Sequence, residues 1–114
     1  MTGTGHQLEF IYTPLFETTT ADLLDDEVMR GVELTLLAEP RVGALVAGTG
    51  GIRKLRVPLP GRGKRGGVRL IYLYIEVRGR IHFLVAYAKN EQVDLSAAEK
   101  KMLRSMVKHL EALG

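Results

Sequence analysis

Hydrophobic and polar positions along the first quarter of the chain predict a strand followed by a weak helix. Leu8, Phe10 and Tyr12 recur at every second position, and this period of two predicts a strand over Gln7–Tyr12. Residues Pro14–Leu24 predict a helix of low propensity, because a run of three threonines disfavours the helical conformation.

A second, amphipathic helix is predicted between Asp25 and Pro40. Asp25 is a suitable N-cap, and the two acidic residues after it lie near the positive end of the helix dipole. Proline cannot continue the helix, so we expect it to end before Pro40. Its apolar stripe consists of Val28, Met29, Val32, Leu36 and Leu37.

The second half of the chain predicts three strands, over Ile52–Val57, Val68–Val77 and Arg80–Ala88. A tight hairpin turn at Arg78 and Gly79 joins the last two strands. The segment between the first two, PLPGRGKRGG (58–67), is rich in glycine and proline and predicts a flexible basic loop.

The last predicted helix begins at a capping box formed by Ser96 and Glu99. The order of elements predicts a single α+β domain over residues 1–114, an antiparallel sheet with N-terminal helices and a C-terminal helix. We expect the helices to pack mostly on one face of the sheet, which leaves the other face for solvent or a ligand.

Composition excludes several classes of protein. The chain has no cysteine, which excludes disulfides, thiolate zinc sites and a cysteine nucleophile, and which fits a reducing cytosol. No apolar run approaches the ~20 residues of a membrane helix, and the N-terminus does not have the pattern of a signal peptide. We therefore expect a cytoplasmic protein without a membrane partner.

We also expect no metal and no cofactor. The histidines His6, His82 and His109 fall on separate predicted elements, without the spacing of metal ligands. The glycine-rich segments 48–51 and 61–67 do not match the phosphate-binding loop of nucleotide-binding proteins, and neither lies between a parallel strand and a helix.

Charge is distributed unevenly, although the net charge is only +3. Residues 1–40 contain eight acidic residues and one basic residue, whereas residues 41–75 contain eight basic residues and no acidic one. A polyanionic partner such as a phosphate backbone explains this segment most directly. The alternative is a solvated basic face, but such faces usually mix both signs of charge.

The strand Ile52–Val57 carries the clearest candidates for chemistry. Side chains alternate across a strand, so Lys54 and Arg56 point to one face and Leu55 and Val57 to the other. With the apolar pair in the core, the two cations stand about 7 Å apart on the open face. This distance is close to the spacing of neighbouring phosphates.

Three further residues could join this pair as catalytic candidates. Arg69 opens the next strand, while Lys89 and Asn90 close the last one at the same edge of the sheet. Basic residues in or near the flexible loop are expected to position RNA through its phosphates, and a tyrosine beside Lys89 could stack on a base. The residues assigned to RNA binding are Arg53, Arg62, Lys64, Arg65 and Tyr87.

Three segments taken together, GTGGIRKLRV (48–57), GRGKRGGVRLIYLY (61–74) and AYAKNEQVDLS (86–96), resemble the RelE/ParE superfamily of type II toxin–antitoxin toxins, and most closely its HigB-like branch. The resemblance implies a compact RelE-like fold and an endoribonuclease that cleaves mRNA in the ribosomal A site and inhibits translation. It also implies a cognate antitoxin, which we expect to be of the helix-turn-helix type.

The resemblance extends to individual residues. Lys54 and Arg56 match the two basic strand positions of the family's ribonucleases, and Arg69 matches the arginine that starts the following strand. Lys89 and Asn90 match a Lys-Arg pair, so Asn90 departs from the pattern. The tyrosine that some members carry just after this pair is missing here.

A metal-free ribonuclease can use the 2′-hydroxyl of RNA as its nucleophile. Lys54, beside two arginines, is the candidate base, while Arg56 and Arg69 would hold the phosphate in bidentate geometry. Lys89 or water would protonate the leaving 5′-oxygen, giving a 2′,3′-cyclic phosphate and a 5′-hydroxyl. Two alternatives remain open: a ParE-like gyrase poison on the same fold, and a non-catalytic module that binds nucleic-acid backbones.

Overall fold

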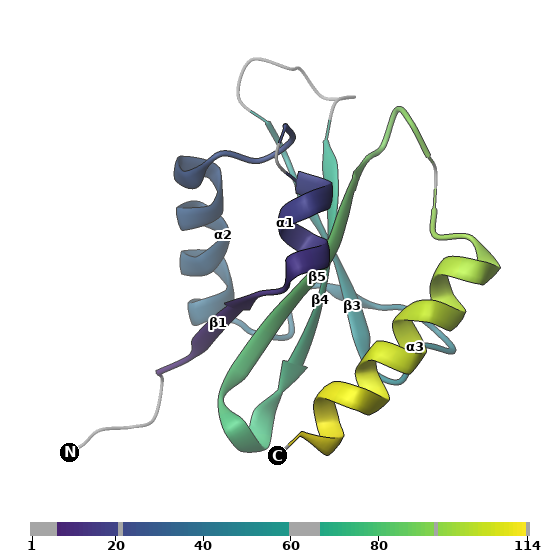
Figure 1. The fold of residues 1–114 in the computed structure, drawn as a ribbon. Coiled ribbons are helices and arrows are strands. Elements are labelled where there is room, and N and C mark those ends of the chain that lie inside the picture. The colour runs from purple at the N-terminus through teal and green to yellow at the C-terminus, as the bar shows by residue number, and fades with distance from the viewer. Residues whose placement is uncertain (1–6, 21, 60–66, 93, 114) are drawn as a thin grey trace.

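The computed structural model describes residues 7–20, 22–59, 67–92 and 94–113, and within them the chain forms five strands, three α-helices and one short 3-10 helix (Figure 1). The strands are β1 (Glu9–Tyr12), β2 (Ala44–Leu45), β3 (Ile52–Val57), β4 (Val68–Ile75) and β5 (Arg80–Ala88). The helices are α1 (Pro14–Thr20), α2 (Asp26–Ala38), the 3-10 helix η1 (Glu76–Arg78) and α3 (Ala97–Ala112). This arrangement confirms the predicted α+β class.

The strands form one sheet in the order β1-β5-β4-β3-β2. Strands β2, β3, β4 and β5 pair in antiparallel fashion, whereas β1 pairs with β5 in parallel. The expected fully antiparallel sheet is therefore wrong at one edge, because alternation along a strand does not reveal the direction of its neighbour. The two-residue β2 was not predicted either, since its segment is rich in glycine and small residues.

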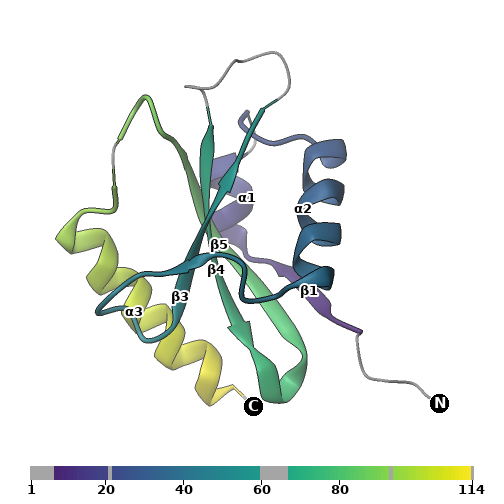
Figure 2. The ribbon, with the colours of Figure 1, turned by 180° about the vertical axis from the view of Figure 1, so that it is seen from behind.

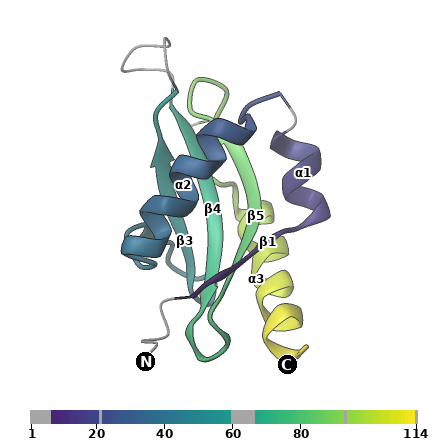
Figure 3. The ribbon, with the colours of Figure 1, turned by 90° about the vertical axis from the view of Figure 1, so that its left-hand side faces the viewer.

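The helices cover both faces of the sheet, and the expectation that they pack mostly on one face is wrong. Helices α1 and α2 lie on one side and α3 on the other (Figures 1 and 3). Strand β4 shows the reason, because its alternate residues belong to two different cores. Leu70 and Tyr72 pack in the core that includes α1 and α2, while Ile71 and Leu73 pack in the core that includes α3. Such a nearly continuous apolar run is typical of a strand buried on both faces.

Two predicted helix starts are confirmed. Asp25 caps α2 by accepting a hydrogen bond from the backbone N–H of Val28 at 2.8 Å. At the start of α3, Ser96 Oγ accepts from the Glu99 N–H at 3.1 Å, and Glu99 Oε1 accepts from the Ser96 N–H at 2.8 Å. Helix α1 is shorter than predicted and ends at Thr20, whose hydroxyl donates to the Phe16 carbonyl at 2.6 Å. Such local bonds weaken the preference of threonine for helix interiors.

The hairpin between β4 and β5 differs slightly from the predicted tight turn. Strand β4 ends at Ile75, and η1 then leads to Gly79, which adopts a left-handed conformation with φ 61°. The pairing also shifts within the hairpin, since Ile71 pairs with Val85 and Tyr72 with Phe83. One residue of β5 is thus extra at this point, which is the definition of a β-bulge.

Tyr72 connects the segment after α2 to the sheet through two hydrogen bonds. Its buried hydroxyl donates to the Pro40 carbonyl at 2.8 Å and accepts from the Gly43 N–H at 2.9 Å. Farther along, the segment between β2 and β3 reaches α3, where Arg104 Nη1 donates to the Gly48 carbonyl at 3.2 Å (Figure 2). These contacts connect the segments on either side of β2 to β4 and to α3.

Candidate active site

Arg56, Arg69 and Tyr87 lie side by side across three neighbouring strands. Arg56 of β3 is paired with Arg69 of β4, and Arg69 is paired with Tyr87 of β5. Directly opposite residues of antiparallel strands point to the same face of a sheet. The three side chains therefore share the face on which α3 packs, and the predicted approach of Arg69 to Arg56 is confirmed.

Lys54 shares this face, as the alternation of β3 predicts. Leu55 and Val57 pack in the core on the side of α2, whereas Ile52, two residues before Lys54, packs in the core on the side of α3. The predicted separation of Lys54 and Arg56 from Leu55 and Val57 is thus confirmed, but their face is not open as expected, because α3 packs on it. We call Lys54, Arg56 and Arg69 the cationic cluster.

Asp94 supplies a counter-charge to the cationic cluster that the sequence pattern did not reveal. Its Oδ1 lies 3.5 Å from Lys54 Nζ. The backbone N–H of Leu95 donates to the same oxygen at 2.7 Å, and this bond lowers the pKa of Asp94, with the nearby charge of Lys54 acting in the same direction. Since Asp94 is 40 positions beyond Lys54 in the chain, only the path of the segment after β5 brings them together.

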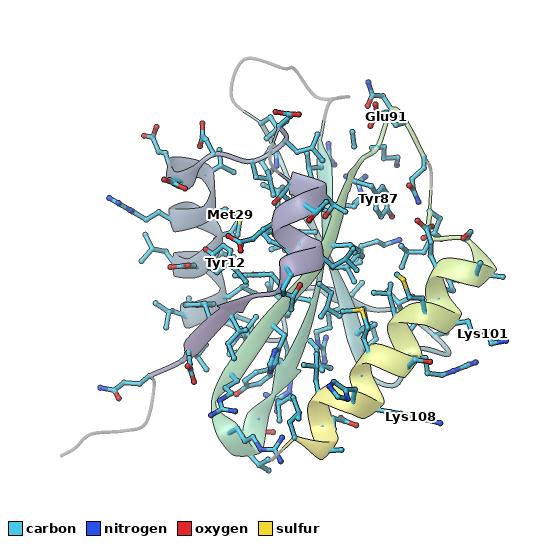
Figure 4. The ribbon with its side chains drawn as sticks, in the orientation of Figure 1. Tyr12, Met29, Tyr87, Glu91, Lys101 and Lys108 are labelled. Atoms are coloured by element: carbon cyan, nitrogen blue, oxygen red, sulfur yellow. The ribbon has the colours of Figure 1, made fainter. Side chains whose placement is uncertain are left out.

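Tyr87 is too buried for its predicted role of stacking on a base. Only 7% of the residue is exposed, and it packs with Leu95 and Leu103 on the side of α3 (Figure 4). Burial raises the pKa of Tyr87, the charge of Asp94 adds to this effect, and the charge of Arg69 opposes it. A ring this buried offers no face to a base, so the arrangement does not support the expected stacking.

The aligned residues Arg56, Arg69 and Tyr87 form a row across the sheet. Two buried polar atoms of this row, Arg69 Nη1 and Tyr87 Oη, have no hydrogen-bond partner within the described part of the chain. Buried donors are nearly always paired in folded proteins. The oxygen of an anion would satisfy the guanidinium N–H, and arginine forks bind the oxygens of phosphate groups in bidentate geometry. The row is therefore suited to binding a phosphate group.

Most of the chain matches a known toxin family in sequence. A model described as the RelE toxin of the RelE/RelB toxin–antitoxin system matches residues 19–114. The chain belongs to the RelE toxin family. This confirms the resemblance at the level of the superfamily, while the HigB-like branch stays a prediction.

Solved structures support the RelE-like fold. The chain is similar to an arginine-to-alanine double mutant of the E. coli toxin RelE in the free state, with a TM-score of 0.53 and 16% identity over 75% of this chain and 87% of that one. It is also similar to a chain of the intact E. coli RelBE toxin–antitoxin complex, with a TM-score of 0.54 and 17% identity over 70% of this chain and 94% of that one.

The other predicted site residues of this RelE-family chain lie in different places. The Lys89 N–H donates to the Gly67 carbonyl at 3.1 Å, which extends the pairing of β4 and β5 by one residue beyond the cluster. Asn90 is exposed in the turn that follows. Arg53 points to the opposite face, where its Nη1 donates to the Gly43 carbonyl at 2.7 Å and to the Arg41 carbonyl at 3.0 Å. The predicted contacts at Arg62, Lys64 and Arg65 lie outside the described residues.

Other classes of site find little support in the described ranges. No group of three or more histidine, cysteine or acidic residues there could hold a metal ion. In the same ranges, no helix has the length and apolar character needed to cross a membrane. The chemistry open to the cationic cluster is electrostatic: it can bind a phosphodiester and stabilise the negative charge that develops on it.

Proposed function

We propose that this RelE-family protein is an endoribonuclease toxin that cleaves translated mRNA on the ribosome, and that the cationic cluster is its active site. One observation carries the proposal: Arg56 and Arg69 are directly paired on one face, and an N–H of Arg69 is buried without a partner in the described part of the chain. A pair of like charges opposite each other destabilises a sheet. An anionic substrate would remove that cost.

The proposed reaction uses the nucleophile that RNA carries. The 2′-oxygen attacks the adjacent phosphorus, its proton passes to the Lys54 amine, and the bond from phosphorus to the 5′-oxygen breaks. Arg56 and Arg69 neutralise the charge on the non-bridging oxygens, while Lys89 or water protonates the leaving 5′-oxygen. The products are a 2′,3′-cyclic phosphate and a 5′-hydroxyl, and no metal takes part.

Asp94 has a defined place in this mechanism. Its contact with Lys54 at 3.5 Å would orient the amine on the face that Lys54 shares with Arg56. Since its own carboxylate repels an incoming phosphodiester, Asp94 also limits the affinity for nucleic acid outside the ribosome. Positioning of mRNA by the ribosome would then supply the missing part of the binding.

We further propose that a cognate antitoxin of the helix-turn-helix type neutralises the protein, and that an acidic segment of this antitoxin covers the cationic cluster. The E. coli RelBE structure is a toxin–antitoxin complex. Complementary charge would speed the encounter and exclude RNA. The cytoplasm, where translated mRNA is found, is the proposed compartment.

Controlled expression in bacteria tests the proposal. The wild-type chain should arrest growth and translation, and mapped 5′ ends should show cuts within translated transcripts. Arg69→Ala should permit growth at equal soluble expression, whereas Lys101→Ala, on the outer side of α3 (Figure 4), should arrest growth like the wild type. Arrest with intact transcripts and broken chromosomal DNA would instead support a gyrase poison. Tolerated expression with RNA binding but no cuts would support a binding module.

A further inference from the structure

Gly67, which comes directly before β4, is buried beside the cationic cluster. Its backbone does not explain why this position is a glycine, since it is not among the described glycines with positive φ. Those glycines are Gly48, Gly50, Gly51 and Gly79. The space around position 67 offers a direct reason for glycine.

A side chain at position 67 would lie against two guanidinium groups. A Cβ built on Gly67 would lie 3.2 Å from Arg69 Nη1 and 3.6 Å from Arg56 Nε, with the Val57 carbonyl oxygen at 3.5 Å. The contact with Arg69 is tighter than ordinary packing, so that group would have to move by a few tenths of an ångström. The other two distances are ordinary van der Waals contacts.

We propose that Gly67 is a positioning residue: the missing side chain lets Arg56 and Arg69 approach each other over the start of β4 and sets the orientation in which they hold a phosphodiester. This inference rests on the proposed function of the cationic cluster. Gly67 itself does not touch the reacting atoms. It acts through Arg69 above all, because Arg69 Nη1 is the nearest atom.

The structure separates this role from a role in folding. The atom that must move is the end of a long side chain, which can shift without moving the backbone. Small displacements of a catalytic group reduce rates strongly, and a shift of about 1 Å can cost roughly 100-fold. A methyl group at position 67 should therefore change catalysis much more than it changes stability.

Cleavage of ribosome-bound mRNA by Gly67→Ala and Gly67→Val tests the proposal. We expect kcat to fall about 10-fold for alanine and about 100-fold for valine, with KM changed less. The melting temperature of Gly67→Ala should stay close to that of the wild type. Gly31→Ala is the matched control, because a Cβ there meets nothing within 4 Å, and it should cleave at the wild-type rate.

A double-mutant cycle distinguishes positioning from a general structural effect. Arg69→Lys keeps a positive charge but removes Nη1, so Gly67→Ala should cost much less in that background. Equal costs in both backgrounds, or full activity of Gly67→Ala, would overturn the inference. If Gly67→Val does not fold, the alanine variant decides alone. Inactivity of the wild type, or full activity of Arg69→Ala, would overturn the proposed function instead.

Discussion

Arg69 lies directly opposite Arg56 in the pairing of β3 with β4, so two guanidinium groups share one face of the sheet. Placing like charges opposite each other costs stability, and a bound anion should recover it. Inorganic sulfate at millimolar concentration should therefore raise the melting temperature of the wild type, because a ligand that binds only the folded state stabilises it.

The same sulfate titration on Arg69→Ala should give a clearly smaller rise. Sodium chloride at matched ionic strength separates specific binding from general screening. An equal response of both proteins to sulfate would show that the arginine pair does not bind the anion.

Asp94→Asn should increase the affinity for short single-stranded RNA several-fold at low salt, because it removes a carboxylate 3.5 Å from Lys54. The gain should disappear as salt screens the charges. Stability should change by about 1 kcal/mol or less, since the pair is partly exposed. Fluorescence anisotropy against salt concentration measures the effect, and Glu111→Gln, in the last turn of α3, is the control of equal charge change. Unchanged affinity would remove Asp94 from the site.

Gly43→Ala should destabilise the protein by about 1–3 kcal/mol. A Cβ at this position would lie 2.8 Å from the Tyr72 ring and 3.0 Å from the backbone oxygen of Lys54, neither of which can move freely. Tyr72→Phe should cost a similar amount, because it leaves two backbone groups without their partner. Urea unfolding measures both, with Gly31→Ala as the control. Wild-type stability of Gly43→Ala would contradict the close packing described for Tyr72.

The capping box predicts a defined loss of stability in acid. The backbone N–H of Ser96 lowers the pKa of Glu99 below its ordinary value of 4.5. A carboxylate with a lowered pKa stabilises the fold at pH values above its ordinary pKa, and this contribution is lost as the pH falls through the lowered value.

Glu99→Gln should therefore be less stable than the wild type at neutral pH, and the difference should shrink as the pH falls below 4.5. Chemical unfolding at a series of pH values measures this difference. A difference that stays constant from neutral to acidic pH would show that the ionised carboxylate does not stabilise α3.

The cluster itself could be predicted from the sequence because it depends on local order. Alternation along β3 placed Lys54 and Arg56 on one face, and Arg69 begins the strand that comes next in the chain. The capping residues Asp25 and Ser96 were predictable for the same reason, since each contacts groups within three positions along the chain.

Contacts between distant segments could not be predicted in this way. Nothing in the local pattern around Asp94 indicates that it reaches Lys54, and the apolar alternation of β5 does not say that Tyr87 is covered on the side of α3. The expectation that the helices pack mostly on one face was wrong, and the continuous apolar run of β4 is the local pattern that argues against it. Long-range packing decided these features.

The measurement that tests the central claim most directly is the cleavage rate of mRNA on purified, programmed ribosomes in the presence of EDTA, compared between the wild type and Arg69→Ala. The account predicts that the wild type cuts and leaves a 2′,3′-cyclic phosphate. It also predicts that Arg69→Ala remains folded but cuts about 100-fold to 1000-fold more slowly. Equal cleavage rates for two folded proteins would contradict it.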